Sequence, residues 1–222
     1  MTAPAPGTAD QVPPNGPSAS VIVVVGGDGP PPARPAWSLI GPALTALSGF
    51  YLFALGFGLL GAAMQGALHL PDWAIPGHFV AYLLSALLAV PVGVLVGRRW
   101  PIAVTLPAAV LLVLGTLWSS LAPGGGSLLF SRALTGFAAG LAWGVTAALV
   151  VQMRARHVWV APLIGGLAVL SLAFGAVAGW LLTLGVSWRM PFLLAVPFEV
   201  VAVLATAVTG IVLLTRRHPQ GH

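Results

Sequence analysis

Cysteine and lysine are absent from this 222-residue sequence, and charged residues of every kind are scarce. Without cysteine the chain has no disulfide, no thiol nucleophile and no thiolate metal site. Charged residues make up 6% of the sequence, whereas a soluble domain carries about 25%. The scarcity of charge therefore excludes an ordinary soluble domain.

What charge remains is mostly arginine, and the net charge is +5. A nucleic-acid-binding module would gather its basic residues on one polar surface, but these arginines lie between long apolar segments. The sequence also lacks a phosphate-binding glycine loop followed by Lys, a zinc-binding HExxH motif and a nucleophile elbow. We therefore expect no enzyme activity, no cofactor, no metal and no nucleic-acid partner.

Six long apolar segments predict six transmembrane helices, because a membrane span needs roughly 20 apolar residues. The predicted spans are residues 43–67, 79–97, 102–121, 128–153, 160–184 and 192–215. The predicted fold class is all-α membrane, with a six-helix transmembrane domain over residues 38–217. Residues 1–37 form a predicted disordered Pro/Gly-rich tail, and residues 218–222 a short second tail.

The arginines also predict how the chain is oriented in the bilayer. With the N-terminus in the cytoplasm, Arg189 alone falls in an outer loop, and seven arginines lie at inner positions. The inner set is Arg34, Arg98, Arg99, Arg154, Arg156, Arg216 and Arg217. Cytoplasmic loops are enriched in basic residues, so we expect a multi-pass protein of the plasma (inner) membrane with both termini cytoplasmic.

Small residues recur every four positions in four predicted spans, and this spacing predicts close approach of helix backbones. The four stripes are Gly58, Ala62 and Gly66; Ser85, Ala89, Gly93 and Gly97; Gly136, Gly140 and Gly144; and Ser171, Gly175 and Gly179. They indicate a tight bundle but not what the bundle does.

Two charged residues lie inside predicted spans. Arg132 falls about one turn inside the fourth span, and an arginine there either faces a cavity or partner, or extends to the outer interface. Glu199 is the one carboxylate in any predicted span. It is either a proton site or a structural hydrogen-bonding group. Both residues lie in the outer halves of their spans, so they could pair.

Other polar residues on the spans are weaker candidates. Tyr51, Gln65, Tyr82, Ser85 and Gln152 either line a cavity or form hydrogen bonds between helices. Trp100, Trp159 and Trp188 flank span ends, as an interfacial aromatic belt predicts. His69 and His78 flank the first outer loop with Asp72, where solvated loop residues are favoured over a metal site.

Three passages resemble the major facilitator superfamily. Residues 91–99 (PVGVLVGRR) are similar to the signature loop between the second and third helices, with matches at Gly93, Leu95 and Arg98. Residues 131–140 (SRALTGFAAG) resemble the Arg-x-x-x-Gly-x-x-x-Gly passage of the fourth helix. Residues 174–179 and 187–192 resemble the antiporter signature and the Trp-Arg-x-x-Phe entry to the sixth helix.

The resemblance covers about residues 49–217 and is nearest to bacterial drug:proton antiporters and sugar-efflux pumps. It implies the N-terminal six-helix half of such a transporter. It also implies proton coupling at Arg132 and cytoplasmic gating near Gly93, Arg98 and Arg99. Two residues depart from the family pattern: Gly97 stands where the family has Asp, and Ala176 stands where antiporters have Pro.

Two functions follow as expectations. The first is a half-size exporter of a small, partly apolar molecule by proton antiport. It would act as a homodimer or with a partner half, since the sequence stops where the family's central linker would begin. The candidate substrate or proton-pathway residues are Arg132, Glu199, Tyr51 and Gln65. The second is a degenerate or accessory membrane scaffold that does not transport.

Overall fold

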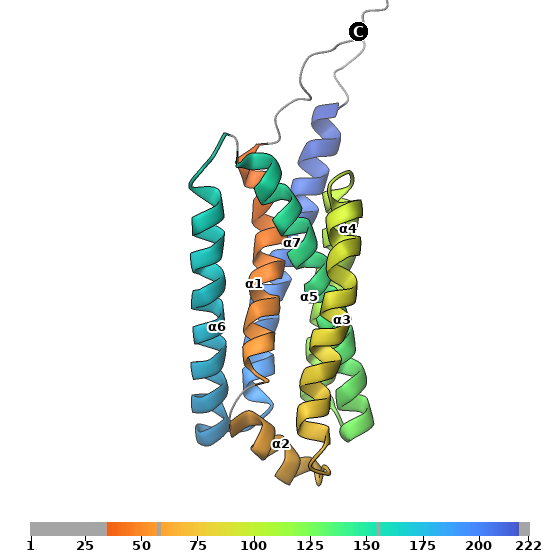
Figure 1. Ribbon diagram of the computed structural model, residues 1–222, viewed down its shortest axis with the longest axis vertical. Coiled ribbons are helices and arrows are strands. Elements are labelled where there is room, and N and C mark those ends of the chain that lie inside the picture. The colour runs from red at the N-terminus through yellow and green to blue at the C-terminus, as the bar shows by residue number, and fades with distance from the viewer. Residues whose placement is uncertain (1–34, 57–58, 155, 218–222) are drawn as a thin grey trace, which may run out of the picture. The chain divides into compact units, whose positions relative to one another are not determined.

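The structure is a computed structural model that describes residues 35–56, 59–154 and 156–217. Figure 1 shows a bundle of long helices. Its elements are the 3-10 helix η1 (Ala36–Leu39), α1 (Ile40–Ala54), α2 (Leu59–Leu68), α3 (Ala74–Gly97), α4 (Pro101–Leu121), α5 (Gly125–Met153), α6 (Val160–Gly185) and α7 (Met190–Arg217). No strand occurs in these described ranges.

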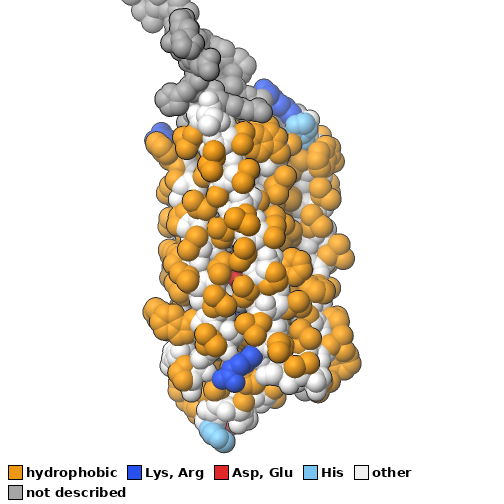
Figure 2. All heavy atoms as spheres, turned by 180° about the vertical axis from the view of Figure 1, so that it is seen from behind, with side chains coloured by type: hydrophobic (Ala, Val, Ile, Leu, Met, Phe, Trp, Pro, Cys, Tyr) orange, Lys and Arg blue, Asp and Glu red, His pale blue; other side chains and the backbone are white. Residues whose placement is uncertain are grey.

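Six of these helices are long and apolar enough to cross a membrane, which confirms the all-α, six-span prediction. The five later spans begin within five residues of the predicted starts. Apolar side chains cover the face of the bundle that Figure 2 shows, and basic side chains lie toward the two ends of this face. The chain therefore has the character of a multi-pass membrane protein.

The prediction of one continuous helix over residues 43–67 is wrong. The first span is η1 with α1, over Ala36–Ala54, and α2 is a separate short helix at the far end of the bundle (Figure 1). Gly56 and Gly58 lie between α1 and α2, and glycine weakens a helix. Leu60 and Met64, one turn apart on α2, are buried there. Apolar composition alone does not separate a span from a helix lying across its end.

Helices α1 and α5 form the interior of the bundle. Helix α5 packs against α3, α4 and α1, while α1 also packs against α6 and α7. Helix α7 closes the bundle against α4 and α1, and α6 packs mainly against α1. An even number of spans brings the start of α1 and the end of α7 to the same end of the bundle (Figure 1).

The tightest contact is the seam between α3 and α5, which run parallel. A β-carbon on Gly136 would overlap the Tyr82 backbone, one on Gly140 that of Ala86, and one on Gly144 that of Val90. These three pairs share one offset along the two helices. Only glycine allows this separation, so the predicted stripe on α5 is a backbone-to-backbone contact.

The stripe predicted over Gly58, Ala62 and Gly66 does not form such a contact. Ala62 and Gly66 are exposed on α2, and a β-carbon on Gly66 would meet no atom within 4 Å. Gly58 lies outside the described residues, as do residues 1–34 and 218–222 of the predicted tails. A periodic stripe indicates packing only where the helix has a neighbour.

Candidate functional site

Arg132 is the largest fully buried side chain of the bundle. It lies about two turns inside α5, and 1% of its surface is exposed. Its Nη1 donates a hydrogen bond of 3.2 Å to the Leu52 carbonyl of α1. Its guanidinium carbon lies 4.6 Å from the centre of the Phe192 ring of α7, a cation–π contact. The side chain therefore points into the bundle and does not extend to the outer interface.

Most of the hydrogen-bonding capacity of Arg132 is unused. Nε and Nη2 are buried and have no partner among the described residues. An unpaired buried donor costs about 1–3 kcal/mol, and more when it is charged. A residue serving only to hold helices together would be expected to have these donors satisfied, so Arg132 is a candidate functional group.

His78 lies next to Arg132 across the α3–α5 seam. The offset that pairs Tyr82 with Gly136 and Ala86 with Gly140 also pairs His78 with Arg132, one turn earlier. His78 is 2% exposed; its Nδ1 contacts the Ala74 carbonyl at 3.2 Å, and its Nε2 has no partner among the described residues. The prediction of a solvated loop histidine is therefore wrong.

Glu199 is the buried carboxylate of α7, with 1% of its surface exposed. Thr116 of α4 donates a 2.8 Å hydrogen bond to its Oε1. Its Oε2 is buried and has no partner among the described residues. The carboxyl group is therefore held on one side and open to a proton or a donor on the other.

Arg132 and Glu199 do not form an ion pair in the described structure: each contacts other groups. Phe192, which lies against Arg132, precedes Glu199 by seven residues on α7. Seven residues of helix span about 10 Å. The arginine and the carboxylate thus lie at two depths of one interior, separated by about two helical turns.

Two tyrosine hydroxyls link α1 to its neighbours beside this site. Tyr51 donates to the Pro191 carbonyl at 2.8 Å, and Tyr82 donates to the Gly49 carbonyl at 2.6 Å. Tyr51 and Leu52 are adjacent on α1, and Pro191 and Phe192 are adjacent on α7. The Tyr51 bond therefore fixes the two backbone segments that hold the Arg132 guanidinium.

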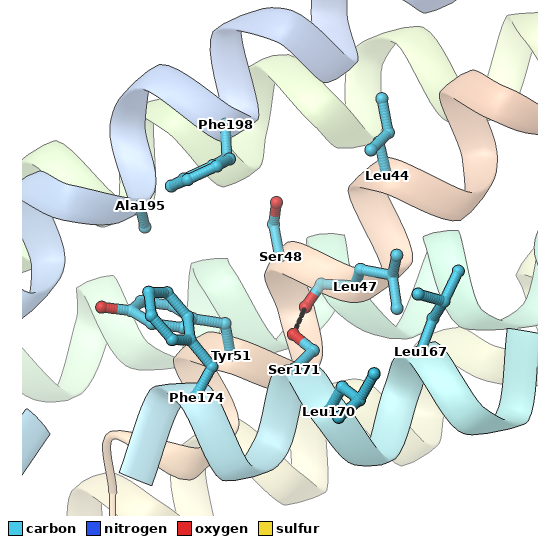
Figure 3. Close-up of a pocket in the computed structure, with 10 residues that line it drawn as sticks. All are labelled: Leu44, Leu47, Ser48, Tyr51, Leu167, Leu170, Ser171, Phe174, Ala195 and Phe198. Atoms are coloured by element: carbon cyan, nitrogen blue, oxygen red, sulfur yellow. Dashed lines mark hydrogen bonds between the residues drawn. The ribbon is translucent and has the colours of Figure 1, made fainter. Parts of the chain in front are cut away.

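An apolar groove opens beside Tyr51 between α1, α6 and α7 (Figure 3). Its volume is about 290 Å³. Its lining residues are Leu44, Leu47, Ser48, Tyr51, Leu167, Leu170, Ser171, Phe174, Ala195 and Phe198. On α1, Tyr51 directly precedes Leu52, whose carbonyl accepts the hydrogen bond from Arg132. On α7, Phe198 directly precedes Glu199. The groove walls on α1 and α7 therefore each contain a residue next in sequence to the buried polar site.

The remaining predicted site residues lie elsewhere. Gln65 lies on the short helix α2, so the prediction that it lies inside a span is wrong. Its side chain donates a hydrogen bond of 2.7 Å to the Asp72 carboxylate. Gly93 packs against the Leu141 backbone, and Arg98 and Arg99 are exposed at the opposite end of the bundle from α2. Gly175 faces Tyr51 of α1, and Gly179 faces Leu55, the residue that follows α1. Ser171 also donates a hydrogen bond of 2.6 Å to the Leu47 carbonyl of α1.

One further expectation about the ends of the spans changes, and it concerns Trp188. The described residues contain no group of three or more His, Asp or Glu side chains able to hold a metal ion. Trp188 is 6% exposed and lies in the core, so it is not an interfacial belt residue, although Trp100 and Trp159 are exposed. The guanidinium carbon of Arg189 lies 4.4 Å from the centre of the Trp188 ring. The Arg189 Nε also donates a hydrogen bond of 2.8 Å to the Ser120 carbonyl.

Reasoning from the sequence missed His78 and Thr116 as interior polar groups. The predicted second span starts at residue 79, whereas α3 starts at Ala74 and has Pro76 in its first turn, where proline is well tolerated. Starting the span at Ala74 would have placed His78 inside it. Thr116 carries no signal of its own, because a buried threonine bonding its own helix looks identical in sequence.

Comparison with known proteins adds no assignment: no family model matches the chain, and no curated protein matches it.

Proposed function

We propose that this protein is a half-size, major-facilitator-like transporter that exports a small, partly apolar molecule by proton antiport. The observation that carries the proposal is the buried pair of Arg132 and Glu199. Each has unpaired polar atoms, and neither neutralises the other. Intramembrane charges are costly and usually serve an ion or substrate pathway.

The surroundings of this pair suggest roles for each group. Glu199 has one oxygen held by Thr116 and one open, so it is the proposed proton carrier. Arg132 would hold an anionic group near by, either on the substrate or on Glu199 after a helix shift, because opposite charge favours the ionised carboxylate. His78 has an unpaired Nε2 beside Arg132 and is a proposed third member of the pathway.

The groove at Tyr51 is the proposed substrate site. Its walls are almost wholly apolar, which suits a small hydrophobic molecule, and Tyr51, Ser48 and Ser171 supply its polar groups. A substrate there would press on the helix segments that hold Arg132 and Glu199. This contact gives substrate binding a route to the proton site.

We further propose that transport requires a second six-helix unit, either another copy of this chain or a partner half. Alternating access rocks one bundle against another, and the described residues form one bundle. The proposal places the protein in the plasma (inner) membrane with both termini cytoplasmic, on the strength of the arginine distribution.

The second candidate is a scaffold that does not transport. Gly97 and Ala176 favour it, because both replace residues of the family's gating and antiporter signatures. If the protein is such a scaffold, the unpaired Nε and Nη2 atoms of Arg132 serve no proton or substrate pathway. The two functions differ in whether proton movement depends on these groups.

The test uses proteoliposomes containing the full chain, a pH-sensitive dye inside and ethidium as the apolar cationic probe. We expect ethidium movement to drive proton flux, and Arg132→Ala to abolish it with expression largely retained. Arg132→Lys should restore it poorly, since lysine cannot both stack on Phe192 and present a planar fork. Arg156→Ala, an exposed arginine outside the site, is the matched control.

Particle mass is measured on the same preparation. Flux from a particle shown to hold one copy and no partner would disprove the two-unit requirement. Full flux in Arg132→Ala would remove that residue from the mechanism, whereas the absence of flux in the unaltered chain would favour the scaffold.

A further inference from the structure

The two unpaired donors of Arg132 lie on one edge of its guanidinium. Nη1 donates to the Leu52 carbonyl at 3.2 Å, and the Phe192 ring lies against the guanidinium carbon at 4.6 Å. The nitrogens without a partner among the described residues are Nε and Nη2. These two nitrogens stand side by side in a guanidinium, and their N–H bonds point the same way. This edge is the fork that binds both oxygens of a carboxylate.

No acidic side chain in the described part of the chain neutralises Arg132. Arginine remains protonated in proteins, and a charge inside an apolar bundle is costly without a partner. The described ranges contain two acidic residues. Asp72 is exposed and accepts a hydrogen bond from Gln65. Glu199 accepts one from Thr116. The fork therefore faces an interior in which the described chain supplies no counter-charge.

His78 makes the surroundings of the fork more polar. It lies at the level of Arg132 across the α3–α5 seam and is 2% exposed. Its Nδ1 contacts the Ala74 carbonyl, and its Nε2 has no partner among the described residues. Buried polar atoms are almost always hydrogen-bonded, so three such atoms at one level indicate a ligand site. A histidine carries no negative charge, so His78 does not replace an anion.

The groove at Tyr51 adjoins this fork on two helices (Figure 3). Ala195 lines the groove and lies one turn after Phe192 on the same face of α7. Tyr51 lines the groove on α1 and directly precedes Leu52, whose carbonyl holds Nη1. The helix segments that hold the guanidinium thus also form walls of the groove, which gives a small ligand an approach to Arg132.

We propose that Arg132 binds a small monocarboxylate anion, whose two oxygens accept hydrogen bonds from Nε and Nη2. Two parallel donors match two carboxylate oxygens, whereas a halide ion offers a single centre. The inference rests on the proposed function in taking Arg132 as a functional group, and it names the class of anion that this group holds. Binding is an equilibrium property and is measured without any gradient or transport.

The test is thermal unfolding of the purified full chain in detergent, followed by tryptophan fluorescence. Sodium acetate replaces sodium chloride at constant ionic strength and pH, and acetamide, which has the shape of acetate without its charge, is the neutral control. A ligand of the folded protein raises the unfolding midpoint with its concentration. We expect acetate to bind at least about fivefold more tightly than chloride, and acetamide to give no shift.

Two variants separate the fork from the charge. Arg132→Gln removes both and should lower acetate affinity at least about tenfold. Arg132→Lys keeps the charge without the fork, so its affinities for acetate and chloride should agree within about twofold. The lysine variant also serves if the glutamine variant fails to fold. Arg156→Gln, an exposed position outside the site, should keep the preference for acetate within about twofold of the unaltered chain.

Three results would overturn the proposal. The first is an equal shift with acetate and chloride in the unaltered chain. The second is an equal acetate shift in Arg132→Gln and the unaltered chain, which would show a general salt effect. The third is an equal shift with acetamide, which would show that the charge of the ligand plays no part. Acetate binding in a chain without flux would support this site and refute transport, whereas flux without acetate binding would overturn this site alone.

Discussion

Helices α5 and α6 have nearly equal length but opposite environments. In an 18-residue apolar stretch of α5, 67% of the residues are buried, against 11% in the corresponding stretch of α6. Yet α6 is the more hydrophobic of the two by mean hydropathy. Helix α5 meets α3, α4 and α1, whereas α6 is held mainly by α1. The more apolar helix is therefore the one that faces outward.

This inversion follows from the solvent. In water, apolar side chains move to the interior because water excludes them. In a bilayer the lipid tails are as apolar as leucine, so the hydrophobicity of a helix no longer decides whether it lies inside the bundle or faces lipid. What draws α5 inward is the close approach allowed by Gly136, Gly140 and Gly144, together with the polar groups that need partners. Small and polar residues, not apolar ones, mark the interior here.

The largest expected effect is at the α3–α5 seam. Gly140→Leu should lower the free energy of unfolding by about 3 kcal/mol and sharply reduce the yield of folded protein in detergent. The reason is that even a β-carbon there would lie 2.7 Å from the Ala86 Cα atom, where neither backbone can yield. Thermal unfolding of the purified protein and its recovery from size-exclusion chromatography measure this.

The matched control for that change lies on α6. A β-carbon on Gly166 would meet no atom within 4 Å, so Gly166→Leu should leave stability unchanged or raise it by about 0.5 kcal/mol through helix propensity. Equal losses in the two variants would contradict the contrast between α5 and α6.

An intermediate effect is expected where α6 meets α1. A β-carbon on Gly175 would lie 2.6 Å from the Tyr51 carbonyl oxygen. Because α6 is held mainly on one side, it can shift outward, and Gly175→Leu should cost about 1 kcal/mol. Unfolding measurements alongside Gly140→Leu sharpen the comparison: a loss as large as that at the seam would mean that α6 is as firmly fixed as α5.

The smallest effect is expected from an interhelical hydrogen bond. Thr116→Val removes the 2.8 Å bond to Glu199 and should cost about 0.6 kcal/mol, the average for such bonds in membrane proteins. Thr105→Val, on the same helix, is the control, because the buried Thr105 hydroxyl has no partner among the described residues. That change should be neutral or stabilising. A loss at Thr116 exceeding that at Gly140 would show that polar bonds, not backbone contact, hold the bundle.

Individual residues show how much of the candidate site could be predicted from the sequence. The burial of charge at Arg132 and Glu199 could be anticipated, because each stands alone in an apolar span. Their partners could not. Leu52 contributes only a carbonyl oxygen, Phe192 a ring face and His78 a position across a seam, and none of these roles has a signal in residue type or spacing. The sequence also allowed Arg132 and Glu199 to pair. In the structure, Glu199 lies about two helical turns along α7 from Phe192, which contacts Arg132, so the two charged residues occupy separate sites.

The sequence by itself determined that the chain crosses a membrane six times, because span length and the absence of charge are local properties. It also determined which residues could pack closely, through the spacing of glycine. Tertiary structure alone decided which glycines have a neighbour: Gly140 meets α3, while Gly66 on α2 meets nothing. It likewise decided that the chain turns into α2 after Ala54. The physical reason is that lipid and protein solvate apolar side chains equally well, so burial is settled by helix-to-helix geometry and not by composition.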